Sequence, residues 1–454
     1  MFKTLLSPAA ALGAAPIRKG LLLLLLLGLL SRGAAAQWTL QPFSFDVPQA
    51  FAYRFAPVTA SVVWALGYDE DAANRSVART TDGGQSWQRR AVPGLAAGEY
   101  ITGLSASSAA SAWICTARNT APGGRVLHTA DGGLTWAEQP GAQFLTSTPD
   151  FVHFFSATDG VAVGSPLNPP ADPFDIFVTH DGGTTWGRAA SVPAPLPFES
   201  GVVLAPAVVG NAIWFATDEG RVFRSIDQGT TWTAAVANTT VSELYAVAFQ
   251  DALHGVALSA HDVSNTLYEH VTADGGLTWQ RMLYAGPLLS GGITGVPGTR
   301  LLVCVGTGDL GPADQGSSYS ADYGATWVPI ETTRQHVGVA AFSAGAVWSG
   351  AVQGATGLGA YRLDATVLSY RSARRLPPLA AYPNPSASGT FRLPLPAAAA
   401  TVRVTDAVGR EVLRTATPAG RAELTLDLRG QRPGLYLLTL ETAAGRARQH
   451  LVIQ

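Results

Sequence analysis

The sequence predicts an all-β protein in two folded parts, preceded by a targeting segment. A turn motif recurs six times at nearly constant spacing, short β-prone runs lie between its copies, and the composition changes near residue 370. Only 14% of the 454 residues are charged while 47% are hydrophobic, which excludes a disordered chain. The formal net charge of −2, without a long basic run, argues against a nucleic-acid-binding protein.

Residues 1–36 have the features of a secretory signal peptide. Lys3, Arg18 and Lys19 give the segment a positive start, and an apolar run of ten residues follows at Leu21–Leu30. Small residues at Ala34–Ala36 provide a cleavage site. Ten apolar residues are too few to cross a bilayer, which needs about 20, and no later segment is longer. We therefore expect an exported mature chain without a transmembrane segment.

The recurring motif has the form Ser/Thr-x-Asp-x-Gly-x-Ser/Thr-Trp, with successive tryptophans 46 to 50 residues apart. Such a period is typical of stacked supersecondary units, and four short β-prone runs within each period are typical of a propeller blade. The aspartate and tryptophan of the six copies are Asp82 and Trp87, Asp131 and Trp136, Asp181 and Trp186, Asp227 and Trp232, Asp274 and Trp279, and Asp322 and Trp327.

Six motifs are compatible with seven blades. After Trp327, Val339–Phe342 and Ala346–Gly350 have the pattern of two further inner strands. Residues Gln37–Pro42 resemble an outer strand such as Thr135–Pro140, so we predict that the mature N-terminus completes a seventh blade. Residues 37–370 are thus predicted to form a seven-bladed β-propeller, with six blades as the alternative.

The residues of the motif suit a hairpin. A short carboxylate can accept hydrogen bonds from the backbone N–H groups of its own turn. The second glycine occurs in all six copies, as expected where φ must be positive, whereas Gln228 and Tyr323 replace the first glycine, whose position is predicted to be less restricted. We expect the tryptophan to wedge between neighbouring blades.

This motif resembles the Asp-box, or BNR, repeat over roughly residues 37–370. That family includes sialidases, sortilin-like receptors, xyloglucanases and photosystem II assembly factor-like proteins. The resemblance implies a β-propeller in which the aspartates and tryptophans of the motif are structural and lie away from the active face. It does not imply one particular activity.

Residues 371–380 are predicted to be a linker and residues 381–454 a second domain. Residues 371–454 hold 12 arginines but only five acidic residues, which leaves 37–370 with a net charge of −13. Runs at 401–406, 411–415, 422–428, 435–441 and 449–453 predict a small antiparallel β-sandwich.

Three ordered motifs mark this second domain: Tyr382-Pro383-Asn384-Pro385, then Asp406–Arg410 with Gly409, then Gly434–Leu438 with Tyr436. Together with the closing segment Arg446–Ile453 they resemble the type A C-terminal sorting domain of the type IX secretion system. The resemblance implies export across the outer membrane of a Gram-negative bacterium, with the secretion machinery as a partner. The protein would then be released or attached to the outer cell surface.

We find no metal-ligand cluster, nucleophile elbow or phosphate loop in the sequence, and we predict neither a cofactor nor a metal. The Asp-boxes join the third and fourth strands of a blade, so they share one rim with the turns between the first and second strands. The opposite rim carries the loops between the second and third strands. These loops hold the carboxylates Asp69, Glu70, Asp172, Asp175, Asp218, Glu219, Asp262, Asp309 and Asp314.

Four more carboxylates lie 11 to 14 residues after a motif tryptophan: Glu99, Asp150, Glu199 and Glu243. Each is expected near the start of an innermost strand, at the mouth of the central channel. Like charges gathered there would raise one another's pKa or attract a cation, and solvated loop carboxylates are the alternative interpretation.

Two functions fit this acidic face. The first is a binding module for an extracellular protein, glycan or cation. The alternative is a glycoside hydrolase with two mouth carboxylates roughly 5–10 Å apart, one of them protonated. Cys115 and Cys304 stand in apolar runs of separate repeats, which favours buried free thiols over a bridge.

Overall fold

The structure, a computed structural model, describes residues 37–454 except 48, 70–73, 119–122, 141–143, 145–146, 203–204, 238–242, 261–265, 354–355, 365–367, 369–379, 396–399, 407–409 and 443–444. The predicted signal peptide and nearly all of the predicted linker lie outside the described residues. The fold is all-β, with a single 3₁₀ turn, η1 (Pro312–Asp314), in the part that is described.

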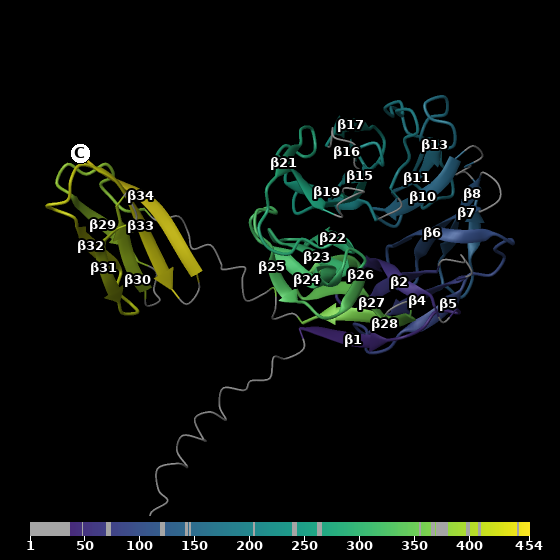
Figure 1. Ribbon diagram of the computed structural model, residues 1–454, viewed down its shortest axis with the longest axis horizontal. Helices are drawn as coiled ribbons and strands as arrows, with labels where there is room; N and C mark the ends of the chain where they lie inside the picture. Colours follow the sequence, from purple (N-terminus) through teal and green to yellow (C-terminus); the bar gives the residue numbers. More distant parts are fainter. Residues whose placement is uncertain are drawn as a thin grey trace, which may run out of the picture. The chain divides into compact units, whose positions relative to one another are not determined.

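Seven four-stranded antiparallel sheets form the β-propeller within the described part of residues 38–363. Figure 1 shows them arranged around a central axis. Six of them follow the chain strand by strand. Their strands are β2 (Phe51–Pro57), β3 (Val63–Tyr68), β4 (Ser76–Thr80) and β5 (Gln88–Ala91); β6 (Glu99–Ala106), β7 (Ala112–Arg118), β8 (Gly124–Thr129) and β9 (Ala137–Gln139); β10 (Ser147–Phe154), β11 (Gly160–Pro166), β12 (Asp175–Thr179) and β13 (Gly187–Arg188); β14 (Ala207–Val209), β15 (Ala212–Ala216), β16 (Arg221–Ser225) and β17 (Thr233–Val236); β18 (Leu244–Phe249), β19 (Gly255–Ala260), β20 (Leu267–Thr272) and β21 (Gln280–Met282); and β22 (Gly292–Gly295), β23 (Leu302–Thr307), β24 (Gln315–Ser320) and β25 (Val328–Glu331).

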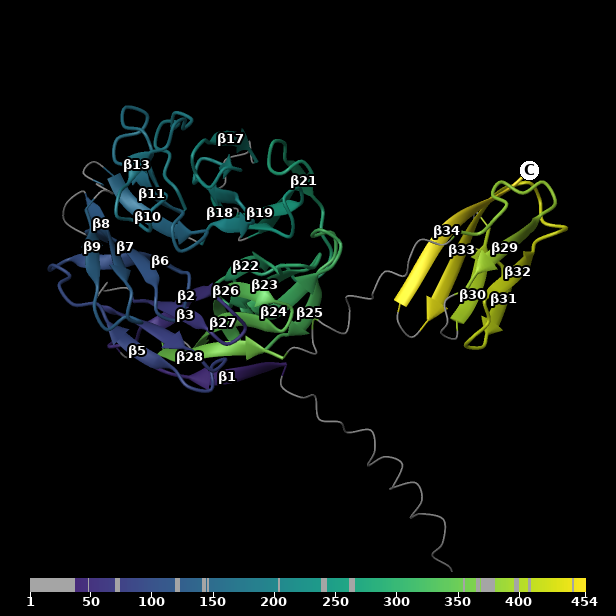
Figure 2. The same ribbon diagram turned by 180° about the vertical axis from the view of Figure 1, so that it is seen from behind.

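The seventh sheet joins the two ends of this part of the chain. Its order is β1 (Trp38–Pro42), β28 (Thr356–Leu363), β27 (Ala346–Gln353) and β26 (Gln335–Ser343). The predicted pairing of the mature N-terminus is confirmed, because Trp38 pairs with Leu363 and Pro42 with Gly359. Strands β1 and β28 lie side by side in both Figure 1 and Figure 2.

Burial along the strands follows from the stacking of sheets face to face. Second strands such as β11 are buried at every residue, because both faces of a blade are covered by neighbouring blades. Outer strands such as β5 are short and largely exposed. The hydrophobic core is therefore a series of clusters between adjacent sheets. Cys115 and Cys304 lie in these layers as buried free thiols, as predicted.

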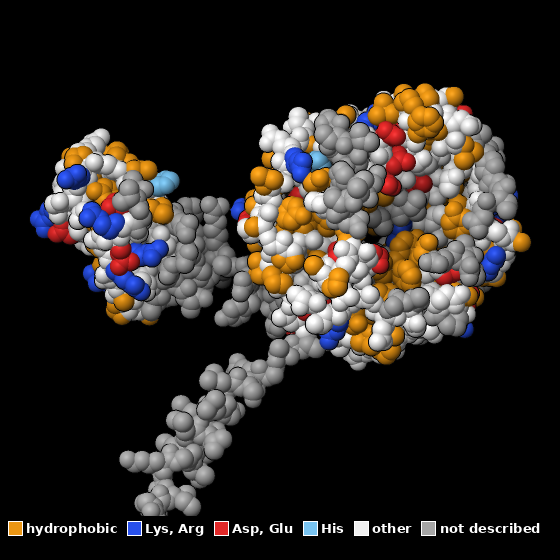
Figure 3. Space-filling view, in the orientation of Figure 1, with side chains coloured by type: hydrophobic (Ala, Val, Ile, Leu, Met, Phe, Trp, Pro, Cys, Tyr) orange, Lys and Arg blue, Asp and Glu red, His pale blue; other side chains and the backbone are white. Residues whose placement is uncertain are grey.

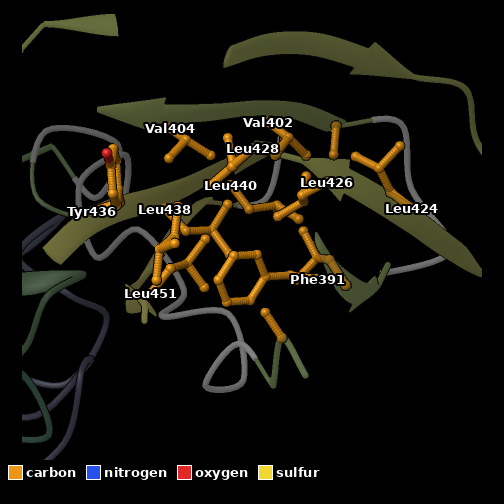
Figure 4. Packing of buried hydrophobic residues seen from close by; sticks show 14 residues of the cluster. Phe391, Val402, Val404, Leu424, Leu426, Leu428, Tyr436, Leu438, Leu440 and Leu451 are labelled. Carbon is orange, nitrogen blue, oxygen red and sulfur yellow. The ribbon is translucent and has the colours of Figure 1, made fainter. Parts of the chain in front are cut away.

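The carboxy-terminal domain is the predicted small antiparallel β-sandwich. Strands β31 (Glu411–Thr417), β30 (Ala400–Thr405), β33 (Gly434–Thr442) and β34 (Gly445–Ile453) form one sheet, and β29 (Thr390–Pro394) and β32 (Glu423–Asp427) form the other. Sequence analysis missed β29. Phe391, Leu426, Leu438 and Leu451 pack between the sheets, as Figure 4 shows, and all are at most 1% exposed.

Candidate functional site

The Asp-box hairpins define one rim of the propeller. In the second copy, Asp131 Oδ1 accepts hydrogen bonds from the backbone N–H of Thr135 and from Thr129 Oγ1, at 2.9 and 2.8 Å. Asp131 Oδ2 accepts one from Thr135 Oγ1 at 2.6 Å. Equivalent bonds hold the other five motif aspartates. In the first copy, the hydrogen bonds from Ser86 lower the pKa of Asp82 to about 2. The carboxylate oxygens of these aspartates therefore bind groups of their own turns.

Both glycine positions of the motif have positive φ, but only the second requires glycine. At the first position Gln228 and Tyr323 have φ of 58° and 62°. A left-handed conformation near φ 60° is open to non-glycine residues at a small cost. The second position has φ near 90°, and a Cβ on Gly229 would meet Val161 of the neighbouring sheet at 2.7 Å, which explains the six glycines there.

Tryptophans on the second strands carry much of the contact between sheets, which sequence analysis did not identify. Trp113 of β7 stacks on Phe154 of the next sheet with ring centroids 3.6 Å apart, and its indole N–H donates to the backbone carbonyl of Gly182 at 3.1 Å. Trp214 of β15 makes the corresponding bond to Gly275 at 2.8 Å. Trp113 and Trp214 thus bind the Asp-box of the next sheet, whereas Trp64 of β3 donates to the backbone carbonyl of Ser108 at 3.0 Å. The motif tryptophans pack beside these contacts.

Glu99 and Glu199, on the opposite rim, are engaged in internal ion pairs. Glu99 Oε1 lies 2.7 Å from Arg125 Nε and accepts a second hydrogen bond from Thr116 Oγ1 at 2.7 Å. Burial raises the pKa of Glu99, but the bonds from Arg125, Ala96 and Thr116 outweigh it and lower the pKa below its ordinary value.

Glu199 repeats this arrangement in another sheet. It pairs with Arg221, its Oε1 accepts from Thr217 Oγ1 at 2.7 Å, and its Oε2 accepts from the backbone N–H of Leu196 at 2.8 Å. Both glutamates are at most 1% exposed. A threonine in or directly after the second strand and an arginine at the start of the third are the sequence signal common to both pairs.

The other two mouth carboxylates differ from this pair. Asp150 is 2% exposed, and burial raises its pKa to about 8 despite a 2.7 Å hydrogen bond from Ser165 Oγ. Its backbone carbonyl accepts a hydrogen bond from Arg54 Nη1 at 3.4 Å. Glu243 immediately precedes β18 and is exposed. The four mouth carboxylates therefore differ in environment: two are ion-paired, Asp150 is buried with a raised pKa, and Glu243 is exposed.

The nine loop carboxylates also divide by environment. Three are buried and have internal partners: Asp69 accepts from the Asn74 N–H of its own loop, Asp175 pairs with Arg188 of β13, and Asp314 binds Ser290 in the connection before β22. Four reach solvent at least in part: Asp172, Asp218, Glu219 and Asp309. Glu70 and Asp262 lie outside the described residues. Figure 3 shows acidic side chains together over the sheets β10–β13 and β14–β17, on whose loops Asp172, Asp218 and Glu219 lie.

An exposed aromatic side chain lies two residues before Ser200, whose backbone contacts Asp218. Phe198, in the connection between β13 and β14, is 83% exposed and has φ of 66°, which is unusual for a bulky residue. Asp218 Oδ1 accepts a hydrogen bond from the backbone N–H of Ser200, two residues further on, at 2.7 Å. The ion pair of Glu199 and Arg221 holds the other side of this connection, because Arg221 also donates to the backbone carbonyl of Ala194.

The channel between the innermost strands contains a cavity of about 410 Å³. Its walls come from β2, β6, β10, β14, β18, β22 and β26. Arg54 and His153 are the charged or titratable side chains of its lining within the described residues, and burial lowers the pKa of His153 to about 4. No group of three or more potential metal-ligating side chains occurs in the described part of the chain.

The sorting motif residues hold the end of the chain in place. Asn384 donates through Nδ2 to the backbone carbonyl of His450 at 2.7 Å and accepts through Oδ1 from the N–H of Val452 at 2.9 Å. The Tyr436 hydroxyl donates to the carbonyl of Arg432 at 2.7 Å. Tyr382, Pro383 and Pro385 belong to the segment that precedes β29, Gly434 starts β33, and Gly409 lies outside the described residues.

Among the described residues, no helix has the length and apolar character that a membrane crossing requires.

A comparison with solved structures supports the β-propeller fold. YCF48 bound to D1 peptide is similar over 73% of this chain and 96% of its own, with 15% identity and a TM-score of 0.52. YCF48 from Cyanidioschyzon merolae has 16% identity over 72% of this chain and 99% of its own, with a TM-score of 0.48. The GH74 enzyme of Niastella koreensis has 14% identity over 89% of this chain and 66% of its own, with a TM-score of 0.45. No curated protein sequence matches the chain.

A family model confirms the origin of the second domain. Residues 380–454 match the secretion system C-terminal sorting domain, in agreement with the motifs around Asn384 and Tyr436. This domain directs export to the outside of the cell in Gram-negative bacteria of the Bacteroidetes type. The carboxy-terminal part of the chain is therefore a sorting domain of the type IX secretion system, and the β-propeller is its exported cargo.

Proposed function

We propose that the propeller is a secreted or surface-held binding module, and that its partner contacts the rim formed by Phe198, Asp172, Asp218 and Glu219. The observation that carries the proposal is the presentation of Phe198. A phenylalanine in water gains nothing for the folded state, and its left-handed backbone costs about 1 kcal/mol. Such a residue is expected where an apolar side chain contacts a partner.

The surroundings of Phe198 support a rigid binding surface. The connection that carries it is bound on one side by the buried pair of Glu199 and Arg221 and on the other by Asp218. Since little of this loop must become ordered on binding, the entropic cost of association is reduced. Glu99 and Glu199 are therefore inferred to position loops, through their ion pairs with Arg125 and Arg221.

The chemistry of the rim favours a protein segment with apolar and basic side chains. Asp218, which binds the backbone two residues after Phe198, and the adjacent Glu219 supply negative charge, within a segment (residues 37–370) of net charge −13. Oppositely charged partners would associate faster at low salt, and the affinity would fall as salt is added. A glycan that stacks on the phenyl ring is the main competing partner.

The test uses the mature chain, residues 37–454, against an array of basic and apolar peptides and an array of glycans. Phe198→Ser should weaken peptide binding at least tenfold, whereas Leu134→Ser should leave it unchanged. Leu134 is a matched control because it is 65% exposed and lies in an Asp-box on the opposite rim. Equal effects of the two substitutions, or binding that is confined to glycans and insensitive to Phe198→Ser, would contradict the proposal.

Glycoside hydrolysis is the second candidate, and the environment of Asp150 is the observation that favours it. A carboxyl group with a pKa of about 8 is protonated at neutral pH, as a general acid must be, and Asp218 contributes to its electrostatic environment. Its 2% exposure leaves little room for a substrate oxygen. Turnover of chromogenic glycosides that is lost in Asp150→Asn and retained in Phe198→Ser would support hydrolysis over the binding role.

A further inference from the structure

The central cavity reaches the Asp-box rim, opposite the rim of Phe198. On β2 its lining runs from Arg54 to Pro57, the last residue of the strand, and on β6 it runs from Leu104 to the last residue, Ala106. Phe342, near the end of β26, also lines it and is 40% exposed. Innermost strands end at the rim that carries the Asp-boxes, so we infer that this is where the cavity opens.

Arg54 lies at the inner end of this cavity. Its guanidinium extends from β2 past β6 and donates through Nη1 to the backbone carbonyl of Asp150 on β10, at 3.4 Å. The same group lies 5.5 Å from the centre of the Tyr53 ring. Arg54 lines the cavity and is 5% exposed, so its charge is largely shielded from bulk water.

The rest of the lining is compatible with an anion. Among the described residues, no aspartate or glutamate side chain lines the cavity, although the surrounding domain is acidic overall. His153 is neutral above about pH 4, because burial lowers its pKa. The walls are the inner edges of the first strands of the sheets.

The remaining side chains are small and apolar. Ala56, Ala106 and Val247 are typical, with Ser105 and Thr294 as the hydroxyl-bearing exceptions. A volume of about 410 Å³ lies within the range of small-molecule sites. A ligand with a short apolar body and one anionic end would place the anion at Arg54 and its body along these walls.

We propose that the cavity binds a small organic carboxylate, which enters from the Asp-box rim and pairs with Arg54. This site is distinct from the rim around Phe198 and does not depend on the proposed protein partner. The probe is butyrate, compared with butyramide, which has nearly the same shape and no charge. A charge-assisted hydrogen bond contributes roughly tenfold to a hundredfold in affinity. The mature chain should therefore bind butyrate at least tenfold more tightly than butyramide, as measured by calorimetry or ligand-detected NMR.

Two pairs of variants locate the bound ion. Thr294 lines the cavity and is half-buried, so Thr294→Glu introduces a negative charge there while Thr294→Gln introduces a neutral side chain of equal length. Thr294→Glu should weaken butyrate binding at least tenfold relative to Thr294→Gln. Arg54→Gln should abolish the preference for butyrate over butyramide, whereas Arg118→Gln, at an exposed residue, should preserve it.

Several outcomes would overturn the proposal. Equal affinities of the unmodified chain for butyrate and butyramide would exclude a carboxylate site whatever the variants do. Equal effects of Thr294→Glu and Thr294→Gln would place the bound ion outside this cavity. Equal competition by chloride and butyrate at the same concentration would show that the site takes inorganic anions without need of the organic body. If Arg54→Gln does not fold, the comparison of Thr294→Glu with Thr294→Gln still shows whether butyrate binds in this cavity.

Discussion

Glu269 is expected to make the stability of the propeller fall as the pH rises. This residue on β20 is fully buried, and its Oε2 accepts a hydrogen bond from the indole N–H of Trp327 in the next sheet at 3.0 Å. Its Oε1 has no hydrogen-bond partner among the described residues. Burial, followed by the smaller effect of Asp322, raises the pKa of Glu269 to about 8, although the bond from Trp327 opposes the shift.

The magnitude follows from proton linkage. Between pH 4.5, the ordinary pKa of a glutamate, and about pH 8, the folded chain holds one proton at Glu269 that the unfolded chain has lost. The folded state is therefore favoured by acid, and each unit of pH increase in this window raises the equilibrium constant for unfolding by up to tenfold. Over the whole window the loss of stability is about 5 kcal/mol, and above pH 8 no further loss arises from this group.

The measurement compares the mature chain with Glu269→Gln in urea unfolding at pH 5, 6, 7, 8 and 9, followed by tryptophan fluorescence. The free energy of unfolding of the variant, relative to the unmodified chain, should rise from pH 5 to pH 8 and then stay constant. Any constant cost of the amide cancels from this pH dependence, and so does the similar titration of Asp150. Glu138→Gln, at a side chain 53% exposed, is the control and should show no such rise. Parallel pH profiles for Glu269→Gln and the unmodified chain would refute the reasoning.

Three further predictions concern the contacts within and between sheets. Arg221→Met leaves Glu199 charged and buried, so the free energy of unfolding in urea should fall by about 3–5 kcal/mol. Adding Glu199→Gln should recover part of this loss. No recovery would contradict the role of the pair. Gly229→Ala should destabilise the chain by a few kcal/mol, about 2 or more, because its φ is near 90° and a neighbouring side chain lies 2.7 Å from the added methyl, whereas Gln228→Gly should be neutral or stabilising. The reverse order in thermal unfolding would argue against the conformational difference between the two positions. Trp214→Phe should cost about 2–3 kcal/mol through a lost hydrogen bond and a cavity between sheets, and an unchanged urea midpoint would show that this contact contributes little.

The repeated motif predicted the propeller well, because the hydrogen bonds that form its hairpins join residues close in sequence. Each motif aspartate binds groups within four residues of itself, so the turn can be recognised in the sequence without knowledge of distant contacts. The outer strand at Gln37–Pro42 could be recognised because it resembles the strand after Trp136. The missed strand β29 follows a proline-rich segment and is short, so it gives little local signal.

The charge state of the candidate site could not be predicted in this way. Glu99 is the first residue of β6, close to its expected place at the start of an innermost strand. Its partner Arg125 is 26 residues away on the third strand, and whether the two side chains meet depends on the pairing register of three strands. A strand boundary predicted from sequence is uncertain by about two residues or more, whereas an ion pair needs its two charged atoms within about 4 Å. The exposure of Phe198 depends in the same way on contacts of its loop.

Because β1 pairs with β28, the first and last parts of the propeller share one sheet, and no terminal repeat is left from which unfolding can start. In an open solenoid the terminal units contact one neighbour only and unfold first. Here the strand that is synthesised first must wait, unpaired, until the last sheet has emerged, and Trp38 then donates to Ser317 Oγ at 2.8 Å across 279 residues of sequence. Once made, this junction means that a protease or a denaturant must open a hydrogen-bonded ladder before it can peel any repeat away.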